Sequence, residues 1–206
     1  MARAALSTQE VETFRQRMTA AALHLFASEG YAAVTMRSVA AALDVSAMTP
    51  YRYVENKDVL WAMVRAEAFR RFADSQVAAV AGQTDPVDRL VALQRAYVRF
   101  AQAQPDAYRV MFELQQDAMA LPELERESRR ALGPLLAATQ DAVKAGVLQG
   151  DPLTMAHLLW ASTHGLVSLH LANKLTLGRS LETLARAALE FQLPAAHKAA
   201  RHRRPQ

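Results

Sequence analysis

The chain contains no cysteine and only 7 glycines among its 206 residues. The lack of cysteine excludes a disulfide framework and a thiolate metal site, and it is compatible with a reducing compartment. No stretch reaches the roughly 18 consecutive apolar residues that a membrane span requires. A basic and then apolar leader is also missing, because Ser7 to Met18 is polar and amphipathic. We therefore expect a cytoplasmic protein.

An excess of charge of one sign is missing from most of the chain. The formal net charge is +4, and Lys198, Arg201, Arg203 and Arg204 supply all of it, so the rest holds 20 basic and 20 acidic side chains. Affinity for nucleic acid must then depend on where charges and helix ends are placed. We expect residues 194–206 to form a basic, disordered tail, with non-specific help in DNA binding as the alternative.

The residues that are abundant favour helices. Hydrophobic residues make up 51% of the chain, Ala, Leu, Arg, Gln and Glu are frequent, and no alternating strand pattern occurs. This composition predicts an all-α protein with about nine helices, broken at Gly and Pro. A Gly133-Pro134 pair predicts a kink in the seventh. The predicted helices span residues 8–28, 35–42, 46–52, 56–80, 85–103, 105–118, 121–145, 151–173 and 180–192.

Residues 35–57, TMRSVAAALDVSAMTPYRYVENK, predict two short helices joined by a three-residue turn. Thr35 and Ser46 are the predicted N-caps of the two helices. Asp44 lies in the turn, where Asp tolerates left-handed dihedral angles, and Pro50 lies early enough in the second helix to be tolerated. Two crossing helices of this kind are the helix-turn-helix geometry that reads a DNA groove. The residues left exposed on the second helix, and so the candidate groove readers, are Ala47, Met48, Thr49, Tyr51 and Arg52.

The region from Ala21 to Trp61 resembles the N-terminal signature of the tetracycline-repressor (TetR) family of bacterial transcription regulators. The resemblance rests on LF in the first helix, a Gly-Tyr break, the Thr-capped helix and the Tyr-Arg-Tyr segment. A weaker resemblance, in PDAYRVMFE at 105–113 and WASTHGLVSL at 160–169, is to a subgroup with Trp and His-Gly in the eighth helix. The resemblance implies a three-helix helix-turn-helix domain at 1–56 and a C-terminal helical bundle at 57–193 that binds a ligand and dimerises.

The same resemblance implies a role for each reading residue. Thr35, Tyr51, Tyr53 and Lys57 would hold phosphates, and Met48, Thr49 and Arg52 would lie nearest to the bases. Arg37 would add a phosphate contact. Two alternatives stay open: Tyr53 acts mainly in the core, and Arg52 forms an ion pair with Glu55.

Two of the later helices carry the apolar spacing of an interface. Two helices from each subunit would form a four-helix contact, and packing within one chain is the alternative. The predicted interface residues are Met155, Leu158, Leu159, Ser162, Leu166, Leu169, Leu181, Leu184 and Ala188.

Aromatic and amphipathic residues on the middle helices are candidates for an effector pocket, although we expect most of them to be ordinary core. No carboxylate stands at a ligand spacing beside His157 and His164, so we expect no metal site. A hydrogen bond is expected to satisfy His164. The candidate pocket residues are Phe69, Phe72, Phe100, Tyr108, Met111, Phe112, Trp160 and His164.

The resemblance implies a homodimeric regulator, most often a repressor, that leaves a palindromic operator when a small-molecule effector binds. The helix at 56–80 would transmit the change, since recognition segments must lie about 34 Å apart to bind one face of the duplex. We expect no enzyme and no cofactor, because the sequence lacks a nucleophile elbow, a phosphate-binding glycine loop and paired carboxylates. The alternatives are a DNA-binding adaptor whose bundle binds a protein, and a helical-bundle enzyme.

Overall fold

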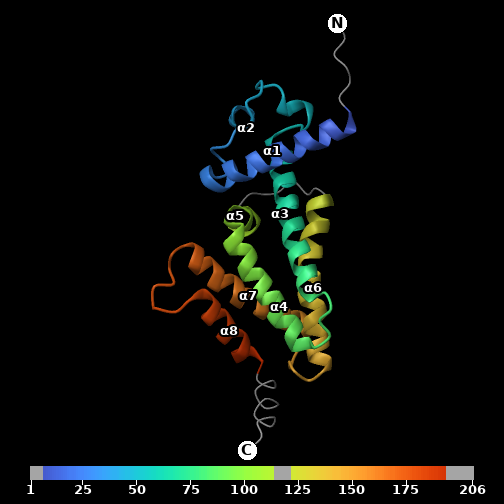
Figure 1. Cartoon of the computed structure of the whole chain (residues 1–206), viewed down its shortest axis with the longest axis vertical. Helices are drawn as coiled ribbons and strands as arrows, with labels where there is room; N and C mark the ends of the chain where they lie inside the picture. The colour runs from blue at the N-terminus through green and yellow to red at the C-terminus, as the bar shows by residue number, and fades with distance from the viewer. Residues whose placement is uncertain (1–6, 114–121, 194–206) are drawn as a thin grey trace, which may run out of the picture. The chain divides into compact units, whose positions relative to one another are not determined.

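The computed structural model of the chain describes residues 7–113 and 122–193, and all regular structure within them is helical (Figure 1). The all-α prediction is confirmed, whereas the predicted tail at 194–206 lies outside the described residues. The elements are α1 (Thr8–Glu29), α2 (Met36–Ala42), the short 3-10 helix η1 (Pro50–Arg52), α3 (Lys57–Val80), α4 (Pro86–Ala103), α5 (Pro105–Phe112), α6 (Pro122–Lys144), α7 (Pro152–Leu171) and α8 (Leu181–Gln192).

Several helices begin at a residue whose side chain accepts hydrogen bonds from the free amides of the first turn. Asp85 accepts from the Val87 amide at 2.8 Å, and Asp151 accepts from the Thr154 amide at 2.8 Å. Both caps are followed by proline, whose missing amide costs nothing at the first helical position. The helix predicted over 105–118 ends at Phe112, and its last predicted residues lie outside the described ones.

The chain divides into two compact units. Of the described residues, the N-terminal unit comprises 7–71, 106–113 and 122–128, and the C-terminal unit comprises 72–105 and 129–193. The long helices α3 and α6 supply residues to both units. The predicted domain boundary at 56/57 was drawn from the family signature and stays a prediction.

The N-terminal unit has an apolar core formed mainly by α1, α2 and the first half of α3. Phe26, Val39, Leu60 and Trp61 are at most 1% exposed, and the Phe26 and Trp61 rings meet edge to face with centroids 4.8 Å apart. This core holds α2 and the residues after it against the longer helices.

In the C-terminal unit, α4, α7 and α8 pack side by side (Figure 1). Leucines from all three helices form the core, together with alanines of α6 that allow close approach. Leu90, Leu159 and Leu189 are 2%, 8% and 5% exposed. The bundle is therefore closed by apolar contact on its inner side.

Candidate functional site

A reciprocal cap fixes the N-terminus of α2, the first helix of the reading motif. The Ser38 amide donates to Thr35 Oγ1 at 3.0 Å, and the Thr35 amide donates to Ser38 Oγ at 3.0 Å. These two amides have no carbonyl of the helix to which they could donate, so the cap satisfies both of them. Thr35 is thus the N-cap that the sequence predicts. The cap determines where α2 begins and thus where the following turn lies.

The turn after α2 depends on one residue in the left-handed region. Asp44 has φ 54°, a backbone conformation that Asp adopts more readily than most residues. The turn lets the Val45 amide donate to the Ala40 carbonyl at 3.1 Å, which closes the end of α2. The predicted turn conformation of Asp44 is confirmed.

The second half of the motif corrects the prediction of an α-helix over residues 46–52. These residues form tight turns that end in η1, and the Thr49 amide donates to the Ser46 carbonyl three residues earlier at 2.8 Å. Pro50 is the reason, since it has no amide to bond Ser46 and its ring crowds that carbonyl. Ser46 still acts as a cap, because the Met48 amide donates to its hydroxyl at 3.4 Å.

The recognition segment, residues 46–53, points several side chains into solvent. Met48 is 69% exposed and Tyr51 is 48% exposed. Arg52 is also exposed, and in the described part of the chain its guanidinium has no hydrogen-bond or ion-pair partner. The alternative of an ion pair with Glu55 therefore finds no support there. The segment presents a cation that is available to an external acceptor.

The remaining predicted readers differ in their exposure. Ala47 and Arg37 are exposed, whereas Thr49 is half-buried. Arg37, like Arg52, makes no ion pair with any described residue. An arginine thus lies free on each half of the motif.

Tyr53 anchors the recognition segment to α1. Its ring stacks on Phe14 with centroids 4.2 Å apart, and its carbonyl accepts a bond from Arg15 at 3.4 Å. Pro50 is buried and Val54 is 4% exposed, so both ends of η1 are anchored in the core. These contacts favour the packing role for Tyr53, and its phosphate contact stays a prediction.

Lys57, a predicted phosphate ligand, already has partners within the N-terminal unit. Its Nζ donates to the Tyr31 carbonyl at 3.0 Å and lies 4.1 Å from the centroid of the Tyr31 ring. The Tyr31 hydroxyl donates to the Asp58 carboxylate. Burial first, and then the bond to Asp58 and its negative charge, raise the pKa of Tyr31 to about 12. Because an ammonium has three donors, Lys57 can still bind a second acceptor from this position.

The predicted effector-pocket residues are divided between the two compact units. The N-terminal unit contains Phe69, Tyr108, Met111 and Phe112. The C-terminal unit contains Phe72, Phe100, Trp160 and His164. Of these, Trp160 lines a small pocket within the C-terminal unit. The hydrogen bond predicted for His164 is confirmed, since its Nδ1 lies 3.0 Å from the Tyr97 hydroxyl.

A small pocket of about 40 Å³ lies between helices of the C-terminal unit, and we refer to it as the interior cavity. Its wall contains no charged side chain. Gln76 of α3 is 4% exposed, and its Nε2 has no hydrogen-bond partner among the described residues. The lining residues are Gln76, Leu90, Leu93, Gln94, Tyr97, Leu135, Leu159, Trp160, Thr163 and Leu189.

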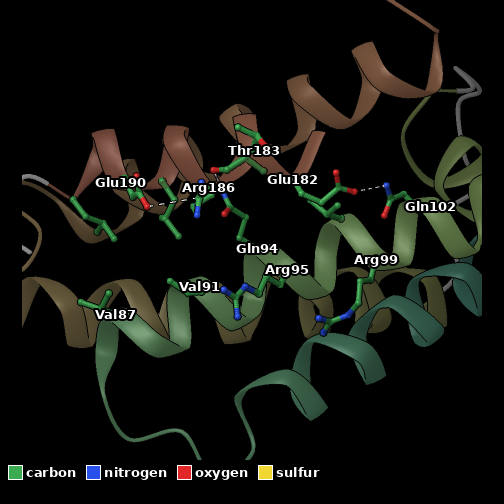
Figure 2. Close-up of a pocket in the computed structure, with 14 residues that line it drawn as sticks. Val87, Val91, Gln94, Arg95, Arg99, Gln102, Glu182, Thr183, Arg186 and Glu190 are labelled. Atoms are coloured by element: carbon green, nitrogen blue, oxygen red, sulfur yellow. Dashed lines mark hydrogen bonds and ion pairs between the residues drawn. The ribbon is translucent and has the colours of Figure 1, made fainter. Parts of the chain in front are cut away.

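A larger groove of about 750 Å³ runs between α4 and α8 on the C-terminal unit (Figure 2). Its edges carry both signs of charge: Gln102 donates to Glu182 at 2.8 Å, and Arg186 lies 3.9 Å from Glu190. The bond from Gln102 is the largest of several effects that lower the pKa of Glu182. Arg186 and Glu190 pair with each other, whereas Arg95 and Arg99 on the α4 side have no partner among the described residues, so the groove favours an anion.

The C-terminal unit also exposes apolar side chains on α7 and α8. Leu158 is 53% exposed, Leu169 is 46% exposed and Phe191 is 87% exposed. Phe191 follows Leu184 and Ala188 at helical spacing on one face of α8, and these two are half-buried. The apolar stripe of Leu184, Ala188 and Phe191 is therefore only partly covered by other residues of the same chain, and its Phe191 end is exposed.

Other predicted interface residues are fully or partly buried within the single chain. Leu159 is 8% exposed and Leu181 is 2% exposed, so both are core residues of the single chain, in agreement with the alternative of intrachain packing at these positions. Met155, Ser162 and Leu166 are half-buried.

Two family models match the chain, one over each part. Residues 19–63 match the model described as bacterial regulatory proteins, tetR family, and residues 90–191 match the tetracyclin repressor-like C-terminal domain. The chain belongs to the TetR family. As a TetR-family protein, it is a transcriptional regulator that binds operator DNA as a dimer and responds to a small molecule.

Solved structures resemble this TetR-family chain over most of its length. A TetR-family regulator from Marinobacter aquaeolei VT8 is 19% identical, with a TM-score of 0.74, and the match covers 92% of this chain and 98% of that one. AibR, solved with isovaleryl coenzyme A and operator DNA, is 19% identical at a TM-score of 0.70, covering 87% and 98%. FadR from Bacillus halodurans is 16% identical at a TM-score of 0.73, covering 92% and 97%. A comparison with curated proteins found no match.

Three residues of this TetR-family protein were missed by sequence reasoning although they contribute to the sites. Gln76 and Gln94 are polar positions on otherwise apolar helix faces, which is the signal that would have found them. Tyr31 was seen as part of a break, and nothing in the sequence indicates that it contacts Lys57. Among residues 7–113 and 122–193, no helix is long and apolar enough to cross a membrane, and no group of three or more His, Cys, Asp or Glu could hold a metal.

Proposed function

We propose that the chain is a repressor whose dimer occupies a palindromic operator until a small effector binds the interior cavity. The observation that supports this most directly is Arg52, an exposed guanidinium without a partner in the described chain, on a segment whose other side is buried. Such a group is placed to bind a base edge without first breaking an internal bond. The proposal includes a cytoplasmic location and no catalytic step.

The division of labour follows the partners of each side chain. Arg52 and Met48 read bases, because they are exposed and have no competing polar partner among the described residues. Tyr51, Arg37 and Lys57 bind phosphates and set the register of the motif on the duplex. Lys57 contributes less than Arg52, since it must share its ammonium with the Tyr31 carbonyl.

Dimerisation uses the exposed apolar faces of α7 and α8. Leu158, Leu169 and Phe191 expose large apolar side chains on these two helices, and a contact between two subunits would remove them from water. A twofold contact would bury each residue twice. It would also place two recognition segments on one operator, as a palindrome requires.

Release of DNA involves α3, which begins with Lys57 in the N-terminal unit and carries Gln76 in the C-terminal unit. A ligand that moves the wall of the interior cavity displaces Gln76, and the helix carries the displacement toward Lys57. A change of a few ångströms in the separation of two recognition segments prevents both from binding one duplex.

The test is selection of DNA sites by the purified dimer from a random pool, followed by titration at a stated salt concentration of about 0.15 M. We expect a palindromic site that binds two subunits or a multiple of two. Arg52→Ala should weaken binding to this site by about 1–3 kcal/mol for each half-site. Arg95→Ala is the matched control, because it removes the same charge from the C-terminal unit. Unchanged affinity of Arg52→Ala, or no selected site at all, contradicts the proposal.

A further inference from the structure

We propose that the effector is an uncharged molecule with an apolar body and one hydrogen-bond acceptor, and that the amide of Gln76 binds this acceptor in the interior cavity. The inference rests on the proposed function, because it names the ligand of the site through which DNA is released. It is carried by three properties of the cavity: its neutral wall, its unsatisfied amide and its small volume.

The neutral wall excludes an ionised group from the buried part of the ligand. None of the lining residues bears a charge, so a carboxylate or phosphate placed there would lose its hydration without gaining a counterion. The leucines of α4, α6, α7 and α8 instead offer apolar contact to an aliphatic or aromatic body.

Gln76 is a polar group of this wall whose side-chain donor remains unused. Two other polar groups of the wall are bonded within the unit: Gln94 donates to the Ala185 carbonyl at 2.8 Å, and the Thr163 hydroxyl donates to the Leu159 carbonyl at 3.0 Å. Gln76 Nε2 is buried and has no partner among the described residues. A buried donor without an acceptor is unfavourable, so a ligand carbonyl, ester or amide oxygen that accepts from Gln76 gains both its own bond and relief of that cost.

The volume of the interior cavity links this recognition to regulation. At about 40 Å³ it has room for one or a few water molecules, whereas ligand pockets usually measure about 300–1,000 Å³. An effector must therefore displace the water and separate the surrounding helices. A ligand that fits only the enlarged cavity shifts the protein toward that conformation. A purely apolar ligand would leave the Gln76 amide without an acceptor, and it would bind more weakly.

The groove between α4 and α8 is the place where an anionic ligand would bind instead. Arg95 and Arg99 lie one helical turn apart on its α4 side (Figure 2), and neither has a partner among the described residues. Preference for an anion would therefore locate the effector in the groove and overturn the assignment to the interior cavity.

The experiment compares matched ligands on the full-length dimer. The probes are methyl ketones of increasing chain length, each with the alkane and the ionised fatty acid of the same length, at a pH about 3 units or more above the pKa of the acid. Binding to the protein alone is followed by titration calorimetry and by the shift in melting temperature. We expect at least one ketone to bind ten times more tightly than both of its matched compounds. Equal or tighter binding of the acids, or no binding by any ketone, overturns the proposal.

Variants then assign the acceptor to Gln76. Gln76→Met keeps the length of the side chain and removes the amide, so it should weaken ketone binding about tenfold while raising the melting temperature of the free protein. Gln192→Met is the matched control, since Gln192 has a buried Oε1 without a partner among the described residues but does not line the cavity. Should Gln76→Met fail to fold, Gln76→Leu provides the same comparison. Unchanged ketone affinity in the folded Gln76 variant overturns the proposal.

Failure here can be told apart from failure of the proposed function. If the protein selects an operator but anions alone release it, and Arg95→Ala and Arg99→Ala abolish that release, the repressor stands and the neutral-ligand assignment is wrong. If no operator is selected, the repressor fails, and calorimetry on the protein alone still decides whether Gln76 recognises a neutral acceptor.

Discussion

Replacing Phe191 with alanine should separate the dimer while leaving each protomer folded. Phe191 is 87% exposed in the single chain, so its truncation should change the protomer's free energy of unfolding by no more than about 0.5 kcal/mol. Burying one phenylalanine contributes about 1.5–3 kcal/mol, and a twofold interface buries two copies. The dimer should therefore weaken by about 3–6 kcal/mol, a rise in the dissociation constant of roughly two to four orders of magnitude.

Sedimentation of the protein over a dilution series measures this dissociation constant directly. Leu177→Ala is the matched control, because Leu177 is 96% exposed but lies between α7 and α8 rather than on the stripe of Leu184, Ala188 and Phe191. A dissociation constant for Phe191→Ala equal to that of the wild type refutes the assignment of the interface. An equal loss in Leu177→Ala would show that the effect is not specific to this face.

Three further substitutions test the reading motif. Because burial, and then the bond to Asp58 and its charge, raise the pKa of Tyr31 from 10.0 to about 12 in the folded chain, the neutral Tyr31 hydroxyl contributes stability that is fully present below pH 10.0 and is lost as the pH rises through about 12. Urea unfolding across this window should show that loss in the wild type and not in Tyr31→Phe; identical profiles would refute it. Thr35→Ala removes the cap shared with Ser38 and should lower the free energy of unfolding by about 0.5–2 kcal/mol in urea titrations, and no change would mean that the cap is dispensable. Lys57→Ala should weaken binding to selected and scrambled DNA alike and reduce the salt slope by about one, whereas a loss confined to one operator position would contradict its phosphate role.

The sequence predicted best those features that depend on neighbouring residues. The Thr35 cap and the Asp44 turn follow from local side-chain and backbone preferences, and both are present as predicted. The segment 46–52 shows the limit of this reasoning. Pro50 was judged tolerable within a first turn, but the missing bond to Ser46 was enough to replace the α-helix with tighter turns.

Residues brought together by tertiary packing were predicted less well. Phe69 and Phe72 are three residues apart on α3, yet they belong to different compact units. Composition alone cannot tell to which unit each residue belongs. Aromatic side chains suggested an effector pocket, and half of the residues in the wall of the interior cavity are leucines, with Tyr97, Trp160 and three neutral polar residues making up the rest. Gln76 is identified only by its burial and its missing partner, and both are properties of the folded chain.

The small interior cavity also sets the concentration at which this regulator would switch. If the enlarged form made up about 1% of the free protein, an effector would appear about 100 times weaker than its affinity for that form. Trace amounts of apolar metabolites would then leave transcription unchanged, and only accumulation would induce it. Trimming a cavity leucine such as Leu135 to alanine would lower that threshold, which makes the wall of the cavity a natural place to adjust the sensitivity of a biosensor built on this protein.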